Sequence, residues 1–117
     1  MISKEYRLTE RELRKVLSRK KPFFSYVFIA NTCENKLSHG RCGILLSSKC
    51  TKWSVNRNFW RRKFYDLFLP TIQNNHLDIV LVPKKWTTLD YKNEQHIIDF
   101  EKNILFLSKK IQESLSN

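Results

Sequence analysis

The stretch from residue 49 to residue 63 most constrains how this chain can fold. It carries six basic side chains and no acidic one. Like charges this close repel one another, so this segment needs an exposed face. A partner that carries phosphates would relieve the repulsion, because the planar guanidinium of arginine pairs with two phosphate oxygens at once. The basic residues are Lys49, Lys52, Arg57, Arg61, Arg62 and Lys63.

The whole chain shares this excess of positive charge. Its 117 residues include 22 Lys and Arg against 11 Asp and Glu, which gives a formal charge of +11 and a pI near 9.8. Nucleic acid is the favoured partner of such a domain, and an anionic membrane surface is the second. Charge that only aids solubility, or an ordinary solvated helix face, is the simpler alternative. A second basic cluster in residues 7–21 is diluted by Glu10 and Glu12, so RNA contact and surface ion pairing are equally open there.

Length and apolar content favour one domain, 1–117, around one hydrophobic core, with loosely ordered ends at residues 1–6 and 112–117. Apolar residues make up 41% of the chain and aromatic residues 13%. No secretory signal and no long apolar stretch is found, so we expect a cytoplasmic protein. Cys33, Cys42 and Cys50 form no CxxC pair, and adding His39 gives no usual zinc-ligand spacing. We therefore expect reduced thiols and no zinc.

Hydrophobic periodicity predicts one helix and two strands in the first half of the chain. Thr9 begins the helix with a capping box that is completed by Glu12. The apolar positions of this helix are Leu13, Val16 and Leu17. Residues 23–30 predict a strand, residues 31–40 a connecting loop, and residues 41–48 a second strand.

The second half predicts helix, strand and helix. A helix begins near Ser54 and ends at Pro70, and residues 77–82 form a short apolar strand. Asp90 is the expected N-cap of a long final helix. The core stripe of that helix is Ile97, Phe100, Ile104, Leu107 and Ile111, broadened by Ile98 and Leu105. The middle helix places Trp60, Phe64 and Leu67 on one side and Arg57, Asn58, Arg61, Arg62 and Tyr65 on another. The order α-β-β-α-β-α indicates an α+β fold.

The chain contains no convincing catalytic constellation. His39, His76 and His96 are far apart, and no nucleophile motif accompanies any of them. Neither a glycine-rich phosphate loop nor an HExxH motif is present. We therefore expect that the protein alone cleaves no bond.

The order of its motifs resembles the bacterial ribonuclease P protein subunit over roughly residues 7–111. The most specific part is SVNRNFWRR at residues 54–62, which is similar to the "RNR" helix of that family, written approximately RNRxxKRxxRE. The other matching motifs are Arg7-Leu8, Leu13-x-x-x-Leu17, Arg41-Cys42-Gly43-Ile44, Ser48-Lys49 and Asp78-Ile79-Val80.

The resemblance implies a fold and a division of labour. The fold is a single compact α+β domain, with three helices on a small mixed sheet, the order α-β-β-β-α-β-α and a left-handed crossover, as in ribosomal protein S5 domain 2. This is one strand more than hydrophobic periodicity indicates, and we expect the additional strand within residues 23–48. In such an enzyme, the RNA subunit holds the active site and its magnesium, and the holoenzyme hydrolyses a phosphodiester to release the 5′ leader of precursor tRNA. The protein would be a non-catalytic monomer whose partners are these two RNAs, with no membrane.

Two sets of site residues follow from the resemblance by position. The RNA-binding set is Lys49, Lys52, Arg57, Asn58, Arg61, Arg62, Lys63 and Tyr65. The leader-binding cleft, between the first helix and the sheet, is lined by Leu13 and Leu17 of that helix and by Val27 and Ile29 of the first strand. Phe59, Tyr65 and Ser48 replace basic residues of the family pattern. We therefore expect fewer phosphate contacts, with stacking by Phe59 or Tyr65 in compensation, and leader contacts that are weak or made by Phe24, Tyr26 or Phe28.

Two other functions fit the same residues less well. A small ribosomal protein shares the basic, aromatic α+β character, and it would be distinguished by a ribosomal RNA partner. A self-sufficient metal-dependent nuclease would cleave precursor tRNA without an RNA subunit. For Leu13 and Leu17, plain core packing is the alternative to a cleft.

Overall fold

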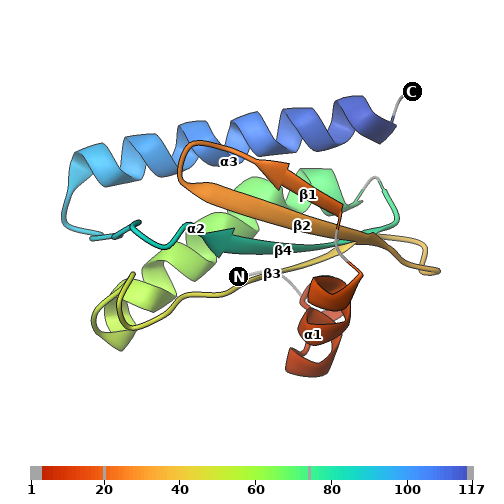
Figure 1. The fold of residues 1–117 in the computed structure, drawn as a ribbon, viewed down its shortest axis with the longest axis horizontal. Coiled ribbons are helices and arrows are strands. Elements are labelled where there is room, and N and C mark those ends of the chain that lie inside the picture. The colour runs from red at the N-terminus through yellow and green to blue at the C-terminus, as the bar shows by residue number, and fades with distance from the viewer. Residues whose placement is uncertain (1–3, 20, 74, 116–117) are drawn as a thin grey trace.

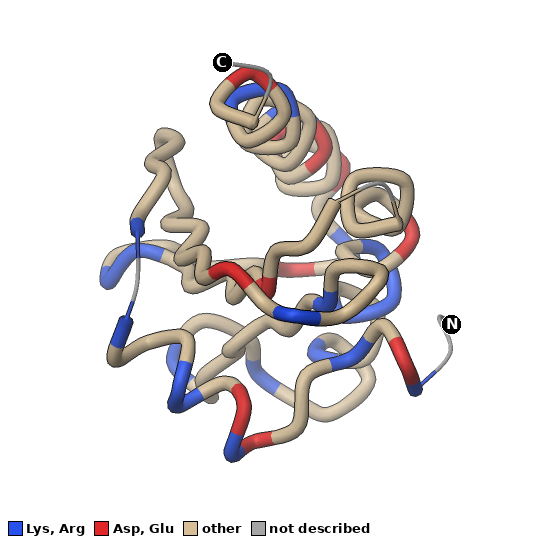
Figure 2. The backbone as a smooth tube through the Cα atoms, turned by 90° about the vertical axis from the view of Figure 1, so that its right-hand side faces the viewer, with Lys and Arg blue, Asp and Glu red and all other residues tan. Residues whose placement is uncertain are grey.

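The computed structural model describes residues 4–19, 21–73 and 75–115, and its elements form three layers (Figure 1). The helices α2 and α3 cover one face of a sheet, and α1 lies on the other side (Figure 2). A short 3-10 helix, η1 (Lys4–Tyr6), precedes them. The order α-β-β-β-α-β-α agrees with the resemblance: α1 (Glu10–Ser18), β1 (Lys21–Phe24), β2 (Phe28–Glu34), β3 (Arg41–Ile44), α2 (Ser54–Gln73), β4 (Leu77–Pro83) and α3 (Glu94–Leu115).

The sheet has four strands in the order β1-β2-β4-β3 and is mixed. β1 pairs with β2 and β2 pairs with β4 in antiparallel fashion, whereas β3 and β4 are parallel. A parallel pair needs a crossover connection, and α2 supplies it. The sequence therefore places the basic helix directly behind the two strands that it joins.

The prediction of one strand over residues 23–30 is wrong, because a turn divides this stretch into β1 and β2. The Phe28 N–H donates to Ser25 Oγ over 3.1 Å, and the Ser25 N–H donates to the Phe28 carbonyl over 2.9 Å. β2 then continues to Glu34, through residues that we expected to be loop, and β3 ends at Ile44 rather than at residue 48. A serine hydroxyl closes the turn, without the Gly, Asn or Pro that usually indicates one.

One hydrophobic core fills the space between the sheet and the two long helices. Alternate strand residues point into it, and Phe28, Ala30, Ile79 and Leu81 are fully buried. The predicted α3 stripe is confirmed, because Phe100, Ile104, Leu107 and Ile111 are buried and Ile97 packs against them. Ile98 and Leu105 do not broaden it, since they are 45% and 57% exposed.

The predicted end of α2 at Pro70 is wrong, because the helix continues to Gln73. Proline removes one backbone donor from the helix, and Pro70 lies on the exposed side of α2. Ile72 is fully buried, and its carbonyl accepts a hydrogen bond from the Gly40 N–H over 2.6 Å. A Cβ on Gly40 would lie 2.9 Å from that carbonyl oxygen, so only glycine approaches this closely. Tertiary contacts therefore hold the last turn.

The N-terminus of α3 also differs from the prediction. Asn93, not Asp90, caps the helix, because its Oδ1 accepts from the N–H groups of Gln95 and His96 over 3.0 and 3.3 Å. Asp90 forms a turn before it, accepting from the Lys92 N–H over 3.0 Å.

The expected loose ends fall partly on the described residues. Residues 4–6 form η1 and residues 112–115 belong to α3, whereas residues 1–3 and 116–117 lie outside the described residues. The loose order of the ends stays a prediction. Among the described helices, none has the length and apolar character needed to cross a membrane.

Candidate nucleic-acid interface

Four of the predicted RNA-binding residues lie on the surface side of α2. Trp60, on the opposite side, is fully buried in the core, and this fixes the rotation of the helix. The indole N–H of Trp60 donates to Asn56 Oδ1 over 2.9 Å, and Asn56 Nδ2 donates to the Leu89 carbonyl over 2.7 Å. The α2 surface therefore has one defined orientation. Its four residues are Arg57, Asn58, Arg61 and Arg62.

Hydrogen bonds aim two of these guanidinium groups without neutralising them. Arg57 Nη1 donates to the Thr51 carbonyl over 3.2 Å, and Arg61 Nη1 donates to Asn58 Oδ1 over 3.1 Å. Within residues 4–19, 21–73 and 75–115, no carboxylate forms a salt bridge with Arg57, Arg61 or Arg62. Each guanidinium carries five N–H donors, so both retain donors for phosphate oxygens.

The amino-terminal segment adds a further guanidinium to this surface. The Leu8 N–H donates to the Cys42 carbonyl over 3.0 Å, and Arg7 forms an isolated parallel bridge with Cys42. This short extension of β3 brings Arg7 next to α2. There it lines a hollow of about 190 Å³ together with Asn58, Arg61, Arg62 and Tyr65. The sequence places Arg7 in a separate cluster, because no local pattern reveals this distant contact.

Tyr65 does not have the stacking role that the sequence predicts. Its ring is only 7% exposed and packs 5.7 Å from the ring of Phe64, centroid to centroid, so it offers no open face to a base. Burial raises the pKa of the Tyr65 phenol, and nearby Cys42 raises it further, although Arg61 and Arg7 act in the opposite direction. The predicted stacking by Tyr65 is therefore wrong. Tyr65 instead contributes a neutral phenol to the lining of the hollow.

The remaining predicted cations divide into two groups. Lys49 and Lys52 are exposed in the connection before α2. Lys63 instead points to α3, where its Nζ lies 2.6 Å from Glu101 Oε1, so it does not share the Arg61 surface. Trp53, which the sequence analysis did not single out, is 68% exposed beside Lys52 with a left-handed backbone (φ 65°). Its exposure and its positive φ mark Trp53 as a further candidate for RNA contact, and both features are visible only in the folded chain.

The predicted cleft residues of α1 face the sheet. α1 contacts β2 and β4, and Val16 is buried there while Leu13 and Leu17 are half-buried. Leu13 sits over Gly43, where a Cβ would approach Leu13 Cδ2 to 2.9 Å. Glycine at this point lets the helix approach the strand. The half-buried leucines leave apolar surface beside α1.

The residues expected on the strand side of the cleft belong to β2 and its turn, not to the first strand. Ile29 is half-buried on the α1 side, because its neighbours Phe28 and Ala30 point into the main core. Val27 packs against the main core, and its N–H donates to Asn103 Oδ1 of α3 over 3.3 Å. Val27 therefore does not join Leu13 and Leu17. Of the aromatic alternatives, Phe28 is fully buried, whereas Phe24 and Tyr26 are 51% and 83% exposed.

A group of charged side chains fixes α1 on the sheet. Arg41 donates to both carboxylate oxygens of Asp78, over 2.9 Å from Nε and 2.7 Å from Nη2. The same guanidinium pairs through Nη1 with Glu12, which also completes the α1 capping box by accepting from the Thr9 N–H over 2.8 Å. Asn35 Nδ2 donates to Asp78 over 2.7 Å. One arginine thus links α1, β3 and β4.

Cys42 and Cys50 are buried core residues whose thiols are protonated at neutral pH. Burial raises the pKa of Cys50 to about 11, against a hydrogen bond from the backbone that lowers it, and burial raises the pKa of Cys42 still further. A protonated thiol is a poor metal ligand. Among the described residues, no three His, Cys, Asp or Glu side chains gather as a metal site.

The comparison with protein families decides between the candidate functions. The family described as ribonuclease P matches residues 2–107 of the chain. The chain belongs to the ribonuclease P protein family. Ribonuclease P is an endoribonuclease built of RNA and protein, in which the protein supports the RNA and the complex forms the 5′ end of tRNA. The ribosomal alternative is thereby set aside.

Solved structures of ribonuclease P proteins share the fold. A Staphylococcus aureus RNase P protein mutant has 19% identity and a TM-score of 0.69, over 93% of this chain and 90% of that chain. The RNase P protein of Thermotoga maritima has 21% identity and a TM-score of 0.67, over 88% of this chain and 96% of that chain. The comparison with curated proteins found no match.

Proposed function

We propose that this ribonuclease P protein binds the catalytic RNA through the arginine surface of α2 and holds the 5′ leader of precursor tRNA beside α1. The observation that carries the proposal is the hollow that Arg7, Arg61 and Arg62 line around Asn58. Three guanidinium groups converge there from two distant segments, and none of the five lining residues is acidic. Phosphate oxygens are the ligands that such a set of donors fits.

The leader site rests on the apolar surface between α1 and the sheet. Leu13 and Leu17 of α1 and Ile29 of β2 are half-buried on the same face of the sheet, where Arg41 of β3 pairs with Glu12 of α1. Aliphatic side chains contact bases but do not stack on them as aromatic rings do. A leader site built of these side chains therefore favours an unpaired strand with little sequence preference.

The protein's contribution to the reaction is electrostatic and positional. Two RNA molecules that approach each other repel through their phosphates, and a cationic protein bound between them lowers that repulsion. Magnesium belongs to the RNA in this proposal, because the described protein residues offer no cluster of oxygen ligands for it. The protein places the substrate, and the RNA carries out the hydrolysis of the phosphodiester.

Reconstitution tests the proposal directly. The purified chain, mixed with the RNA subunit of its own organism and magnesium, is expected to release the 5′ leader from precursor tRNA. The protein without RNA is expected to cleave nothing. Cleavage by the protein alone would overturn the division of labour, and a mixture that binds no precursor tRNA would overturn the proposed partners.

The proposed leader site beside α1 has its own prediction. Leu17→Glu places a carboxylate beside the leader path and is expected to weaken binding of precursor tRNA about tenfold, while binding of the RNA subunit is unchanged, because the new charge repels leader phosphates. Equilibrium binding of both RNAs, with circular dichroism to confirm the fold, measures this. Leu105→Glu, at an exposed position of α3, is the matched control. Equal weakening of both RNAs by Leu17→Glu would contradict a leader site beside α1.

A further inference from the structure

A second cavity on α2 adjoins the hollow that the arginines line. This open pocket measures about 520 Å³, and Asn58 and Arg62 belong to the lining of both cavities. At 100° per residue, Phe59 and Asp66 lie on one side of these two residues and Arg61 lies on the other. Phe59 and Asp66 line only the pocket, and Arg61 lines only the hollow. The two cavities are therefore neighbours on one surface.

Aromatic rings form the apolar wall of the pocket. The rings of Phe59 and Tyr91 lie 5.8 Å apart, centroid to centroid, with an angle of 43° between their planes. Both residues are only half-buried, so each leaves part of its ring open to a ligand. Asn56 fixes the position of Tyr91, because its Oδ1 accepts from the Tyr91 N–H over 3.0 Å and from the indole N–H of buried Trp60 over 2.9 Å. The wall is therefore in place before any ligand binds.

The charges around the pocket differ from those around the hollow. Asp66 is exposed one turn beyond Arg62, and in the described part of the chain it forms no salt bridge. A carboxylate only accepts hydrogen bonds, and it repels phosphate. Lys63 also lines the pocket, but its Nζ lies 2.6 Å from Glu101 Oε1. The pocket therefore favours a flat apolar group that carries N–H donors at its edge.

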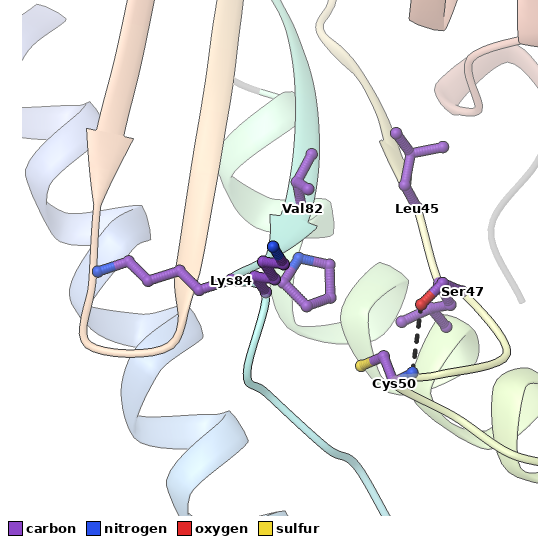
Figure 3. Close-up of a pocket in the computed structure, with 8 residues that line it drawn as sticks. Leu45, Ser47, Cys50, Val82 and Lys84 are labelled. Carbon is purple, nitrogen blue, oxygen red and sulfur yellow. Dashed lines mark hydrogen bonds between the residues drawn. The ribbon is translucent and has the colours of Figure 1, made fainter.

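The pocket between β4 and the segment after β3 lacks these features. It measures about 360 Å³, and Leu45 and Val82 face each other across it (Figure 3). Its lining residues include no aromatic ring and no carboxylate. It therefore offers neither a surface for stacking nor an acceptor for a base edge.

We propose that the two cavities together bind one unpaired guanine nucleotide of the RNA subunit, with its phosphate in the hollow and its base against Phe59 and Tyr91. The inference rests on the proposed function of the α2 surface and adds a base contact to it. A nucleotide joins a phosphate to a flat base through the sugar, and the shared residues Asn58 and Arg62 lie between the two cavities. Unstacked RNA bases bind proteins by stacking on aromatic rings and by hydrogen bonds from their edges.

The carboxylate of Asp66 selects the base. Guanine carries its N1–H and N2–H donors side by side, and these match the two oxygens of one carboxylate. An apolar side chain of a protein partner would also fill the pocket, but it would leave the neighbouring guanidinium groups of Arg61 and Arg62 without an anion.

The first part of the test measures binding of the RNA subunit from the protein's own organism. Phe59→Leu keeps an apolar side chain against Trp60 but removes the ring, and it is expected to weaken binding roughly 5- to 100-fold, the loss that corresponds to one stacked base. The dependence of binding on salt is expected to keep its slope, because no phosphate contact is lost. Phe106→Leu is the matched control, since Phe106 is 49% exposed on α3 and lies 4.8 Å from Lys110 Nζ. It is expected to leave the affinity unchanged.

The second part probes the RNA with kethoxal, which modifies N1 and N2 of unpaired guanines. At saturating protein, the wild-type chain and Phe106→Leu are expected to protect one unpaired guanine that Phe59→Leu and Asp66→Asn leave reactive. Asp66 is exposed, so Asp66→Asn reports on the pocket even where Phe59→Leu lowers stability. Full affinity of Phe59→Leu, or the same guanine reactivity with wild type and with Asp66→Asn, would overturn the base pocket and leave the arginine surface standing. A wild-type chain that binds no RNA subunit would instead overturn the proposed function.

Discussion

Arg41→Ala is expected to destabilise the fold by about 3 kcal/mol, near the lower end for breaking a buried ion pair. The substitution leaves Asp78, which is 6% exposed, without its bidentate partner. Asn35 still donates to Asp78, and Arg41 itself is only half-buried, so the loss stays at that lower end. The free energy of unfolding in urea measures the change. Because the same guanidinium pairs with Glu12, the variant also removes the ion pair that links α1 to β3.

A matched ion pair on the surface provides the control. Arg14 and Glu10 of α1 lie 2.8 Å apart with side chains 78% and 81% exposed. Exposed pairs one helical turn apart contribute little, so Arg14→Ala is expected to cost about 0.5 kcal/mol or less. If the two variants lost the same stability, the account of Arg41 as the link between α1 and the sheet would be refuted.

Replacing Arg57, Arg61 and Arg62 together by glutamine is expected to weaken binding of the RNA subunit about 100- to 500-fold at roughly 0.1 M salt. The estimate follows from three lost phosphate contacts, each of which releases counterions when it forms. The fold is expected to remain intact, because these side chains are absent from the core and glutamine has a similar helix propensity. Filter binding at fixed salt measures the affinity.

A second triple variant removes the same amount of charge elsewhere. Lys102, Lys109 and Lys110 are exposed on α3, and glutamine at these positions also lowers the net charge by three. This control is expected to lose less than about tenfold, since distant exposed charges are screened by salt. Similar losses in both triple variants would show that net charge alone, not the α2 surface, determines RNA binding.

Local sequence signals predicted the elements that local interactions determine. The capping box at Thr9 is confirmed by both of its hydrogen bonds, and the α3 stripe is confirmed by burial. The turn at Ser25 escaped prediction because its hydrogen bonds come from a residue type that occurs throughout the chain. The end of α2 was not predicted because Gly40, from another part of the chain, stabilises the turn beyond Pro70.

The candidate RNA-binding site was likewise predicted only where local spacing determines it. Helical periodicity grouped the α2 arginines correctly, since residues on one helix face are neighbours by geometry. It could not show that Lys63 pairs with Glu101 on α3, that Tyr65 is buried, or that Arg7 joins Arg61. These contacts join segments far apart in the sequence, and only the folded chain brings them together.

The salt dependence of RNA binding tests the α2 surface most directly. For the wild-type chain and the Arg57, Arg61 and Arg62 triple variant, the logarithm of the binding constant for the RNA subunit is plotted against the logarithm of salt concentration. The slope of the triple variant is expected to be shallower by about 2 to 3, since each lost phosphate contact removes about 0.7 to 0.9. Parallel lines would mean that these guanidinium groups do not contact phosphate, and this result would contradict the account.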